Sequence, residues 1–407
     1  MSIPHHERRP LQALASANFA LGSMSYGVVG ALPALAHDWA VTPGHVALLV
    51  AAFSITFAVG APVLQMLFGH MRRRTLLLAG LAGMAIGSIG CALAPNFAWL
   101  LVFRVLAGIG AGAVSPLASA IGAGLVPGER QGRALAIVFV GVTLSSVISA
   151  PVSAWVAHVL GWRAVFALLA TLAIASAGWI VSVVDDATYG IRMEPKGLIQ
   201  LLTRPATASG LSVVLLQTGA FFATYTLILP LLHACFGASL TQGAAALFVF
   251  GVTGIVGNLI AQRASQHWSA DRLLLVSIGA MASMFVVLGA LSIVGGHGAV
   301  FQYSAVALLI VWALAQDLFY PSQMRRAVSL EPPYRGMVLA LNSSGIFAGV
   351  ALGSSLGGHV ADHFGVAWLA LVSAALSFAG LGMLILSRRY LAHRGGKACT
   401  SLSSTPA

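Results

Sequence analysis

The sequence predicts an all-α membrane protein whose twelve transmembrane helices form two six-helix bundles. Three observations lead to this fold class. Hydrophobic residues make up 58% of the 407 residues and charged residues only 8%, against about 25% charged residues in soluble domains. Apolar runs long enough to cross about 30 Å of hydrocarbon recur along the chain. All but two of the 21 Lys and Arg residues lie between or beyond these runs, and only in every second gap.

Each apolar run of about twenty residues or more is interpreted as one spanning helix. In chain order the runs cover residues 11–36, 45–68, 75–94, 97–123, 134–158, 163–184, 208–233, 239–262, 273–294, 299–322, 336–360 and 366–386. The longest polar interruption follows the sixth run. We therefore predict an N-terminal tail (1–10), an N-terminal bundle (11–184), a linker (185–207), a C-terminal bundle (208–386) and a basic tail (387–407). The Ser/Thr-rich end of this tail is typical of disorder.

The positive charges predict the orientation of the chain. They occur at Arg8 and Arg9; Arg72, Arg73 and Arg74; Arg130 and Arg133; Arg192, Lys196 and Arg204; Arg263 and Arg272; Arg325, Arg326 and Arg335; and Arg388, Arg389, Arg394 and Lys397. Because Lys and Arg are enriched in cytoplasmic loops, we expect both termini and the linker in the cytoplasm of a bacterial-type inner membrane. The net charge of +11 then reflects contact with anionic lipid headgroups, not with nucleic acid.

The two predicted bundles resemble each other in sequence. Two constant offsets align Pro33, Phe53, Gly60 and Gln65 with Pro230, Phe250, Gly257 and Gln262, and Gly132, Gly141 and Gly161 with Gly336, Gly345 and Gly365. Six-helix halves related as repeats place a substrate site near the membrane midplane between them.

Five stretches carry recognisable motifs. They are GALPALAHDWAVTP at 30–43, FRVLAGIGAGA from Phe103, PGERQGRALA at 127–136, GWRAVF at 161–166 and LNSSGIFAGVALGSSLGG at 341–358. Together they resemble the major facilitator superfamily, specifically its twelve-helix drug:proton antiporter branch and the sugar (arabinose-like) efflux permeases. The resemblance implies a secondary transporter that works by alternating access. It also implies a small-molecule substrate, coupling to protons and no enzymatic activity. We expect no cofactor and a monomer.

The chain departs from the family pattern at three places: the loop between helices two and three, helix five and helix one. In QMLFGHMRRR (65–74) the usual Gly, Asp-Arg and Gly positions hold other residues, and only Arg73 and Arg74 remain. The helix-five signature survives as Ala150, Pro151 and Ala154, and helix one has Ser25 where relatives often carry an acid. The residues that the resemblance links to conformational change are Arg73, Arg74, Gly108, Gly112 and Pro151.

Two charged residues inside predicted spans are candidates for proton coupling and transport. Arg104 aligns with the helix-four arginine of the family, and a buried Arg costs about 2.5–3.5 kcal/mol on insertion scales. The alternative is that Arg104 snorkels to the nearer membrane surface. Among the ten acidic residues, Asp317 is the one that the prediction places within a span. The alternative is a hydrated Asp near the end of its helix.

Polar and aromatic residues at helical spacing are candidates for the lining of a substrate cavity. They are Asn18, Ser25 and Tyr26 in helix one, Gln217, Phe221 and Tyr225 in helix seven, and Trp312 and Gln316 in helix ten. Aromatic surface with a few amides suits an organic solute, whereas the alternative is ordinary helix packing. His359, Asp362 and His363 have the spacing of a metal-binding helix, but without a third ligand nearby we predict no metal site.

Two further functions compete with proton-coupled efflux. One is a facilitator or proton symporter on the same fold. The other is a transport-inactive membrane sensor or scaffold, suggested by the altered loop between helices two and three and by the missing acid in helix one. The identity of the substrate does not follow from the sequence, because pockets diverge while the scaffold persists.

Overall fold

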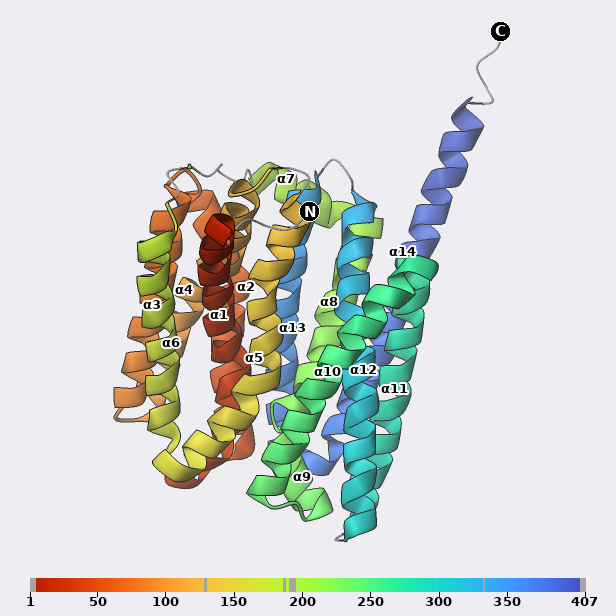
Figure 1. Ribbon diagram of the computed structural model, residues 1–407. Helices are drawn as coiled ribbons and strands as arrows, with labels where there is room; N and C mark the ends of the chain where they lie inside the picture. The colour runs from red at the N-terminus through yellow and green to blue at the C-terminus, as the bar shows by residue number, and fades with distance from the viewer. Residues whose placement is uncertain are drawn as a thin grey trace.

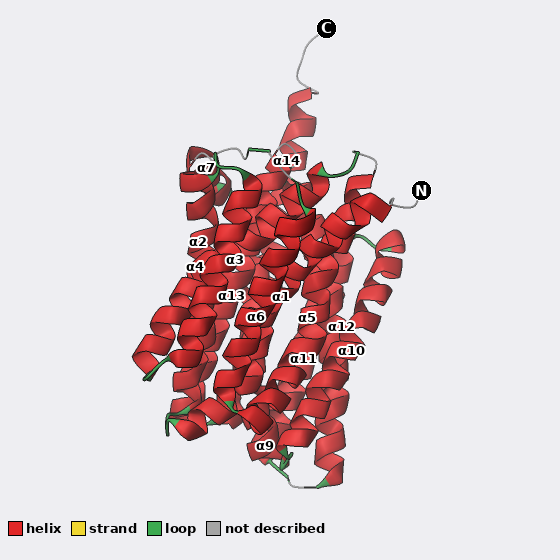
Figure 2. Ribbon diagram, turned by 60° about the vertical axis from the view of Figure 1, so that its left-hand side comes forward, coloured by secondary structure: helices red, strands yellow, loops and turns green. Residues whose placement is uncertain are grey.

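The computed structural model describes residues 5–127, 130–185, 188–189, 195–296, 298–331 and 334–402. These residues form long helices that run along a common direction (Figures 1 and 2). Twelve helices in the described part are long and apolar enough to cross a membrane. The predicted fold class is confirmed.

The first bundle consists of α1 (His5–Asp38), α2 (Pro43–Phe68), α3 (Arg73–Leu93), α4 (Phe97–Gly124), α5 (Gln131–Leu160) and α6 (Trp162–Val183). A short helix, α7 (Pro195–Thr203), precedes the second bundle. That bundle consists of α8 (Pro205–Tyr225), α9 (Ile228–Phe236), α10 (Leu240–His267), α11 (Ala270–Val294), α12 (Ala299–Leu330), α13 (Arg335–Phe364) and α14 (Leu369–Leu402). One 3₁₀ turn, Val366–Trp368, joins α13 to α14.

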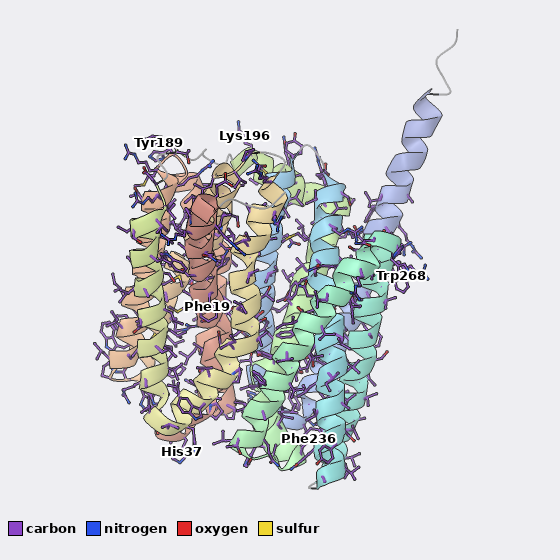
Figure 3. All side chains as sticks on the ribbon, viewed as in Figure 1. Phe19, His37, Tyr189, Lys196, Phe236 and Trp268 are labelled. Carbon is purple, nitrogen blue, oxygen red and sulfur yellow. The ribbon has the colours of Figure 1, made fainter. Side chains whose placement is uncertain are left out.

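Both chain termini and α7 lie at the same end of the bundle, which we call the terminal end (Figure 1). The opposite end, here called the far end, carries α9. Tyr189 and Lys196 mark the terminal end, and His37 and Phe236 mark the far end (Figure 3). Helix N-caps at the far end come from Thr42, Asn96 and Ser239, each of which accepts a hydrogen bond from the backbone three residues on. These caps satisfy donors that a helix start leaves free.

Helix seven differs from the prediction of one continuous span over 208–233, because it is split into α8 and α9. Pro230 has no N–H to donate to the carbonyl of Thr226, and its ring clashes with a helical residue at that position. However, Pro33 lies inside α1 without interrupting it. The hydrogen bond of 2.9 Å between Thr226 Oγ1 and Ser354 Oγ of α13 shows that tertiary contact also holds the break in place.

The C-terminal segment also differs from the prediction, since α14 continues to Leu402, well past the predicted end of the span at 386. The prediction of disorder concerns the Ser/Thr-rich end of the tail, of which residues 403–407 lie outside the described residues. No proline interrupts the chain between Leu369 and Leu402, so the helix can propagate from the apolar segment at low cost.

The two bundles contact each other along two helix pairs, α2 with α13 and α5 with α10. Phe57 and Phe347 stack with ring centroids 3.6 Å apart, and Gly251 of α10 lies against Val147 of α5. Towards the far end, Gly44 approaches Gly358. The contacts between the bundles that we describe therefore extend from the middle of the molecule towards the far end.

Candidate functional site

Arg104 is 1% exposed and lies inside the first bundle. Its Nε donates to the carbonyl of Leu49 in α2 (3.1 Å), and its Nη2 donates to the carbonyl of Met24 in α1 (3.2 Å). Its guanidinium carbon lies 4.4 Å from the centroid of the Phe53 ring, within the range of a cation–π interaction. The side chain therefore does not snorkel, and it joins α4 to α1 and α2.

The carbonyl that Arg104 holds on α1 belongs to Met24, directly before Ser25 and Tyr26. Tyr26 faces the second bundle, where its ring centroid lies 6.0 Å from that of Phe222 and 6.1 Å from that of Tyr225. Arg104 is thus placed to fix the segment of α1 that contacts the other bundle.

An aromatic cluster fills the second bundle behind Tyr26. We define it as Phe221, Phe222, Tyr225, Phe250 and Trp312, from α8, α10 and α12. Phe221 stacks on Tyr225 at 4.7 Å, and Trp312 lies edge-on to Phe221 at 5.1 Å. Of the predicted cavity residues, Tyr26, Phe221, Tyr225 and Trp312 are therefore brought together by the structure.

Two buried polar atoms have no hydrogen-bond partner: Trp312 Nε1, in the aromatic cluster, and Ser25 Oγ, next to Tyr26 in the sequence of α1. The Gln316 amide approaches the Tyr320 hydroxyl, but neither of its polar atoms reaches hydrogen-bond geometry. Buried polar groups are normally paired, and an unpaired one costs about 1–3 kcal/mol. Trp312 Nε1 and Ser25 Oγ therefore have no protein partner in this conformation.

Asp317 lies on α12 beside the aromatic cluster and is partly exposed. It packs on glycines of α10: a Cβ added at Gly257 would lie 3.1 Å from Asp317 Cβ. The hydroxyls of Tyr26 and Tyr320 are within its electrostatic reach, and Tyr320 Oη lies 3.4 Å from Thr218 Oγ1. A carboxyl group thus borders the contact between the bundles.

Two predicted cavity residues point elsewhere. Asn18 Nδ2 donates to the carbonyl of Val138 in α5 (3.1 Å) and therefore lies inside the first bundle. Gln217 Nε2 lies 3.3 Å from both Met281 Sδ and Ser377 Oγ, inside the second bundle. Helical spacing alone did not show which face of these helices turns towards the partner bundle.

Sequence reasoning missed Phe222 and Phe250 as members of the cluster. The internal repeat contained a signal for Phe250, since the offset that aligns Pro33 with Pro230 also aligns Phe53 with Phe250. In the first bundle Phe53 packs under Arg104, and in the second bundle Phe250 packs against Trp312 at 5.3 Å.

The residues linked to conformational change are distributed along the first bundle. Gly108 and Gly112 of α4 face α2, where a Cβ at Gly112 would lie 2.8 Å from the backbone nitrogen of Ala61. Pro151 lies inside α5. The two glycines thus allow α2 and α4 to pack with their backbones in close contact.

The start of α3 and the residue before it are attached to α6 and to the segment that follows α6. The backbone N–H of Arg73 donates to the carbonyl of Thr188 (3.1 Å), and Arg74 Nη2 donates to the carbonyl of Val181 (2.8 Å). Arg72 Nε donates to Tyr189 Oη (3.2 Å), and this hydrogen bond raises the pKa of the guanidinium. In this conformation the basic loop contacts the linker region.

A cavity of about 600 Å³ lies between the bundles at the far end. Its walls come from α1, α2, α5, α9 and α10, and His37, His158 and His233 are among the residues that line it. Within the described ranges, no group of three or more His, Cys, Asp or Glu residues is arranged to hold a metal ion.

The chain matches the Major Facilitator Superfamily over residues 14–324 and again over 211–398. It therefore belongs to this family of transporters, which are not enzymes, and the predicted family is confirmed. It is a multi-pass integral membrane protein. The drug:proton antiporter branch remains a prediction.

Similar proteins match most of the chain or about two thirds of it. The inner membrane transport protein YdhP of Escherichia coli K12 is 28% identical over 379 residues, covering 93% of this chain and 95% of YdhP. A chloramphenicol resistance protein of Streptomyces lividans is 29% identical over 266 residues, covering 64% of this chain and 68% of that protein. The crystal structure of a bacterial homologue of the lysosomal transporter Spinster shares the fold, with a TM-score of 0.73, 16% identity and coverage of 96% and 98%.

Proposed function

We propose that this chain exports a small organic molecule in exchange for protons across a bacterial inner membrane. The observation that carries the proposal is the junction of the two bundles, where Tyr26 meets the aromatic cluster beside buried, unpartnered polar atoms of Ser25, Trp312 and Gln316. Aromatic walls with a few orienting polar groups are the usual make-up of an organic-ligand site. The relative named as a chloramphenicol resistance protein supports an organic solute.

The positive charges support a cytoplasmic location for the terminal end. Lys and Arg of cytoplasmic loops outnumber those outside. Lys196 lies at the terminal end (Figure 3), as does Tyr189, to which Arg72 donates a hydrogen bond. The described contacts between the bundles run from the middle of the molecule to the far end, where a cavity of about 600 Å³ also lies between them. In the proposed export a solute enters at the cytoplasmic end and leaves through the far end. We expect the transporter to act as a monomer surrounded by membrane lipids.

Asp317 is the proposed proton carrier. Its carboxyl lies at the edge of the junction, packed on Gly257 and near the hydroxyls of Tyr26 and Tyr320. The charge of a carboxyl depends on how much water surrounds it and on nearby cations. Rocking of the two bundles changes both, so proton release and solute binding are coupled at this position.

Arg104 is proposed to act through α1. Its hydrogen bond to the carbonyl of Met24 holds the turn that presents Ser25 and Tyr26 to the second bundle. Its charge therefore positions the substrate-facing part of α1 while remaining buried inside the first bundle.

The proposal is tested in proteoliposomes that contain the purified full-length protein. Labelled chloramphenicol is the first probe, followed by antibiotics, sugars and siderophores chosen by thermal shift. We expect Asp317→Asn to abolish accumulation driven by a pH gradient while counterflow of the probe persists, because the amide cannot carry the proton. Met324→Leu, at an exposed position of α12, serves as the control.

The possible outcomes separate the competing functions. Transport in the parent that ignores the pH gradient indicates a facilitator. If Asp317→Asn keeps the full gradient-driven rate, the proton uses another group. Binding of a probe without any counterflow in the parent indicates a sensor or scaffold.

A further inference from the structure

Asp362 lies near the far end of α13, in the sequence HVADH that has the spacing of a metal-binding helix. In the structure the three side chains do not converge. The rings of His359 and His363 lie against each other, with centroids 4.1 Å apart, and His363 Nδ1 lies 2.9 Å from the carbonyl oxygen of its own helix at His359. The carboxylate of Asp362 contacts the other bundle instead.

The Asp362 carboxylate binds the start of α2 with both oxygens. Oδ2 accepts a hydrogen bond from Thr42 Oγ1 at 2.8 Å, and Oδ1 accepts one from the backbone N–H of Gly44 at 2.9 Å. Thr42 is the N-cap of α2, and Gly44 lies in its first turn. The N–H groups of a first turn have no partner within their own helix, and the helix dipole is positive there. A carboxylate of the second bundle thus complements a helix start of the first.

The surrounding backbone leaves no room between the two helices. A Cβ added at Gly358 of α13 would lie 2.9 Å from the carbonyl oxygen of Gly44 and 3.2 Å from the Cβ of Ala47. The helices therefore touch directly beside the carboxylate. Any motion that separates the bundles at the far end breaks both hydrogen bonds of Asp362 at once.

We propose that Asp362 is a positioning residue that latches the far end shut and thereby sets how often that end opens. The inference rests on the proposed alternating access. It assigns a role to an acid outside the aromatic junction, and it explains why the HVADH segment carries a carboxylate without being a metal site. The latch acts between parts of one chain and needs no ligand.

The latch is tested by the reactivity of a thiol at Val46. This residue is 1% exposed, lies in the first turn of α2 and lines the far-end cavity. The reporter chain is full length and carries Val46→Cys and Cys235→Ser. Cys91, which is buried in the first bundle, is kept so that its reactivity reports unfolding. The protein is placed in lipid nanodiscs, which leave both ends accessible, and labelling by a soluble maleimide is followed by peptide mass spectrometry.

We expect Asp362→Ala to increase the labelling rate of Val46→Cys about three- to tenfold, the range for loss of charge-assisted hydrogen bonds at a partly exposed site. Asp362→Asn keeps the shape but loses the charge, so its rate should lie between those of the parent and Asp362→Ala. His363→Ala removes a neighbouring side chain that bonds only within α13 and should match the parent. Cys91 should stay unreactive in all of these variants.

Equal labelling rates for the parent, Asp362→Ala and Asp362→Asn would overturn the latch, as would an equal increase in His363→Ala. An increase that is accompanied by labelling of Cys91 would show general loosening and would also overturn it. The labelling needs no substrate, so a parent that fails to transport while the latch variants behave as expected counts against the proposed function alone. Normal transport with unchanged labelling counts against the latch alone.

Discussion

Arg104→Ala is expected to destabilise the first bundle as well as to stop transport. Two charge-assisted hydrogen bonds, to the carbonyls of Leu49 and Met24, contribute about 1.5–3 kcal/mol each. The contact with Phe53 adds about 1 kcal/mol, and the cost of burying the charge, about 3 kcal/mol, offsets part of this. We therefore expect Arg104→Ala to lower the free energy of unfolding by about 1–4 kcal/mol.

The change is measured by unfolding the purified protein in mixed detergent and SDS micelles. Arg104→Lys should recover part of the stability, because an ammonium group can reach one carbonyl but lacks the planar fork that reaches both. Arg163→Ala is the matched control, since Arg163 is exposed on α6, where it contacts the Trp162 ring at 4.3 Å and the carbonyl of Ala94 at 3.4 Å. If Arg104→Ala unfolds at the same SDS fraction as Arg163→Ala, the positioning role of Arg104 is refuted.

Two further predictions concern the substrate and the topology. Trp312→Phe removes a buried N–H that has no partner, so we expect little change in melting temperature but about tenfold weaker binding of a transported probe, the loss of one hydrogen bond. Unchanged binding would place the solute elsewhere. A thiol introduced at the exposed Ala98, at the far end, should react with an impermeant reagent added outside intact cells. A thiol at Lys196 should react only after permeabilisation. The reverse pattern would show that the orientation is inverted.

The sequence predicted the elements of this fold with little ambiguity, because the membrane imposes a strong constraint. A run of about twenty apolar residues in a membrane must form a helix, because only then are its backbone hydrogen bonds satisfied. Positive charges in every second gap between the runs indicate which gaps lie on the same side of the membrane. Arg104 and Asp317 were found for the same reason, since a charge stands out in an apolar span. The internal repeat also singled out Phe250, because it aligns this residue with Phe53.

The faces of the helices could not be read from the sequence. All sides of a spanning helix are apolar, whether they contact lipid, their own bundle or the partner bundle. The faces of the helix therefore differ little in hydrophobicity, and the 3.6-residue period does not distinguish them. Gln217 and Phe221 share a helical stripe, yet Gln217 bonds to Met281 and Ser377 inside its own bundle while Phe221 belongs to the aromatic cluster.

The sequence by itself determined that the chain is a helical membrane transporter with two similar halves, because hydropathy, charge alternation and family motifs are properties of the chain. Only the tertiary structure decided what the charged and polar residues do. It showed that Arg104 is bound to carbonyls of two other helices. It showed that the helix breaks near Pro230, whereas α1 continues through Pro33. It also showed that Asp362 of the second half is bound to the first turn of α2 in the first half. Each of these depends on a partner far away in the sequence, and folding alone brings the two together.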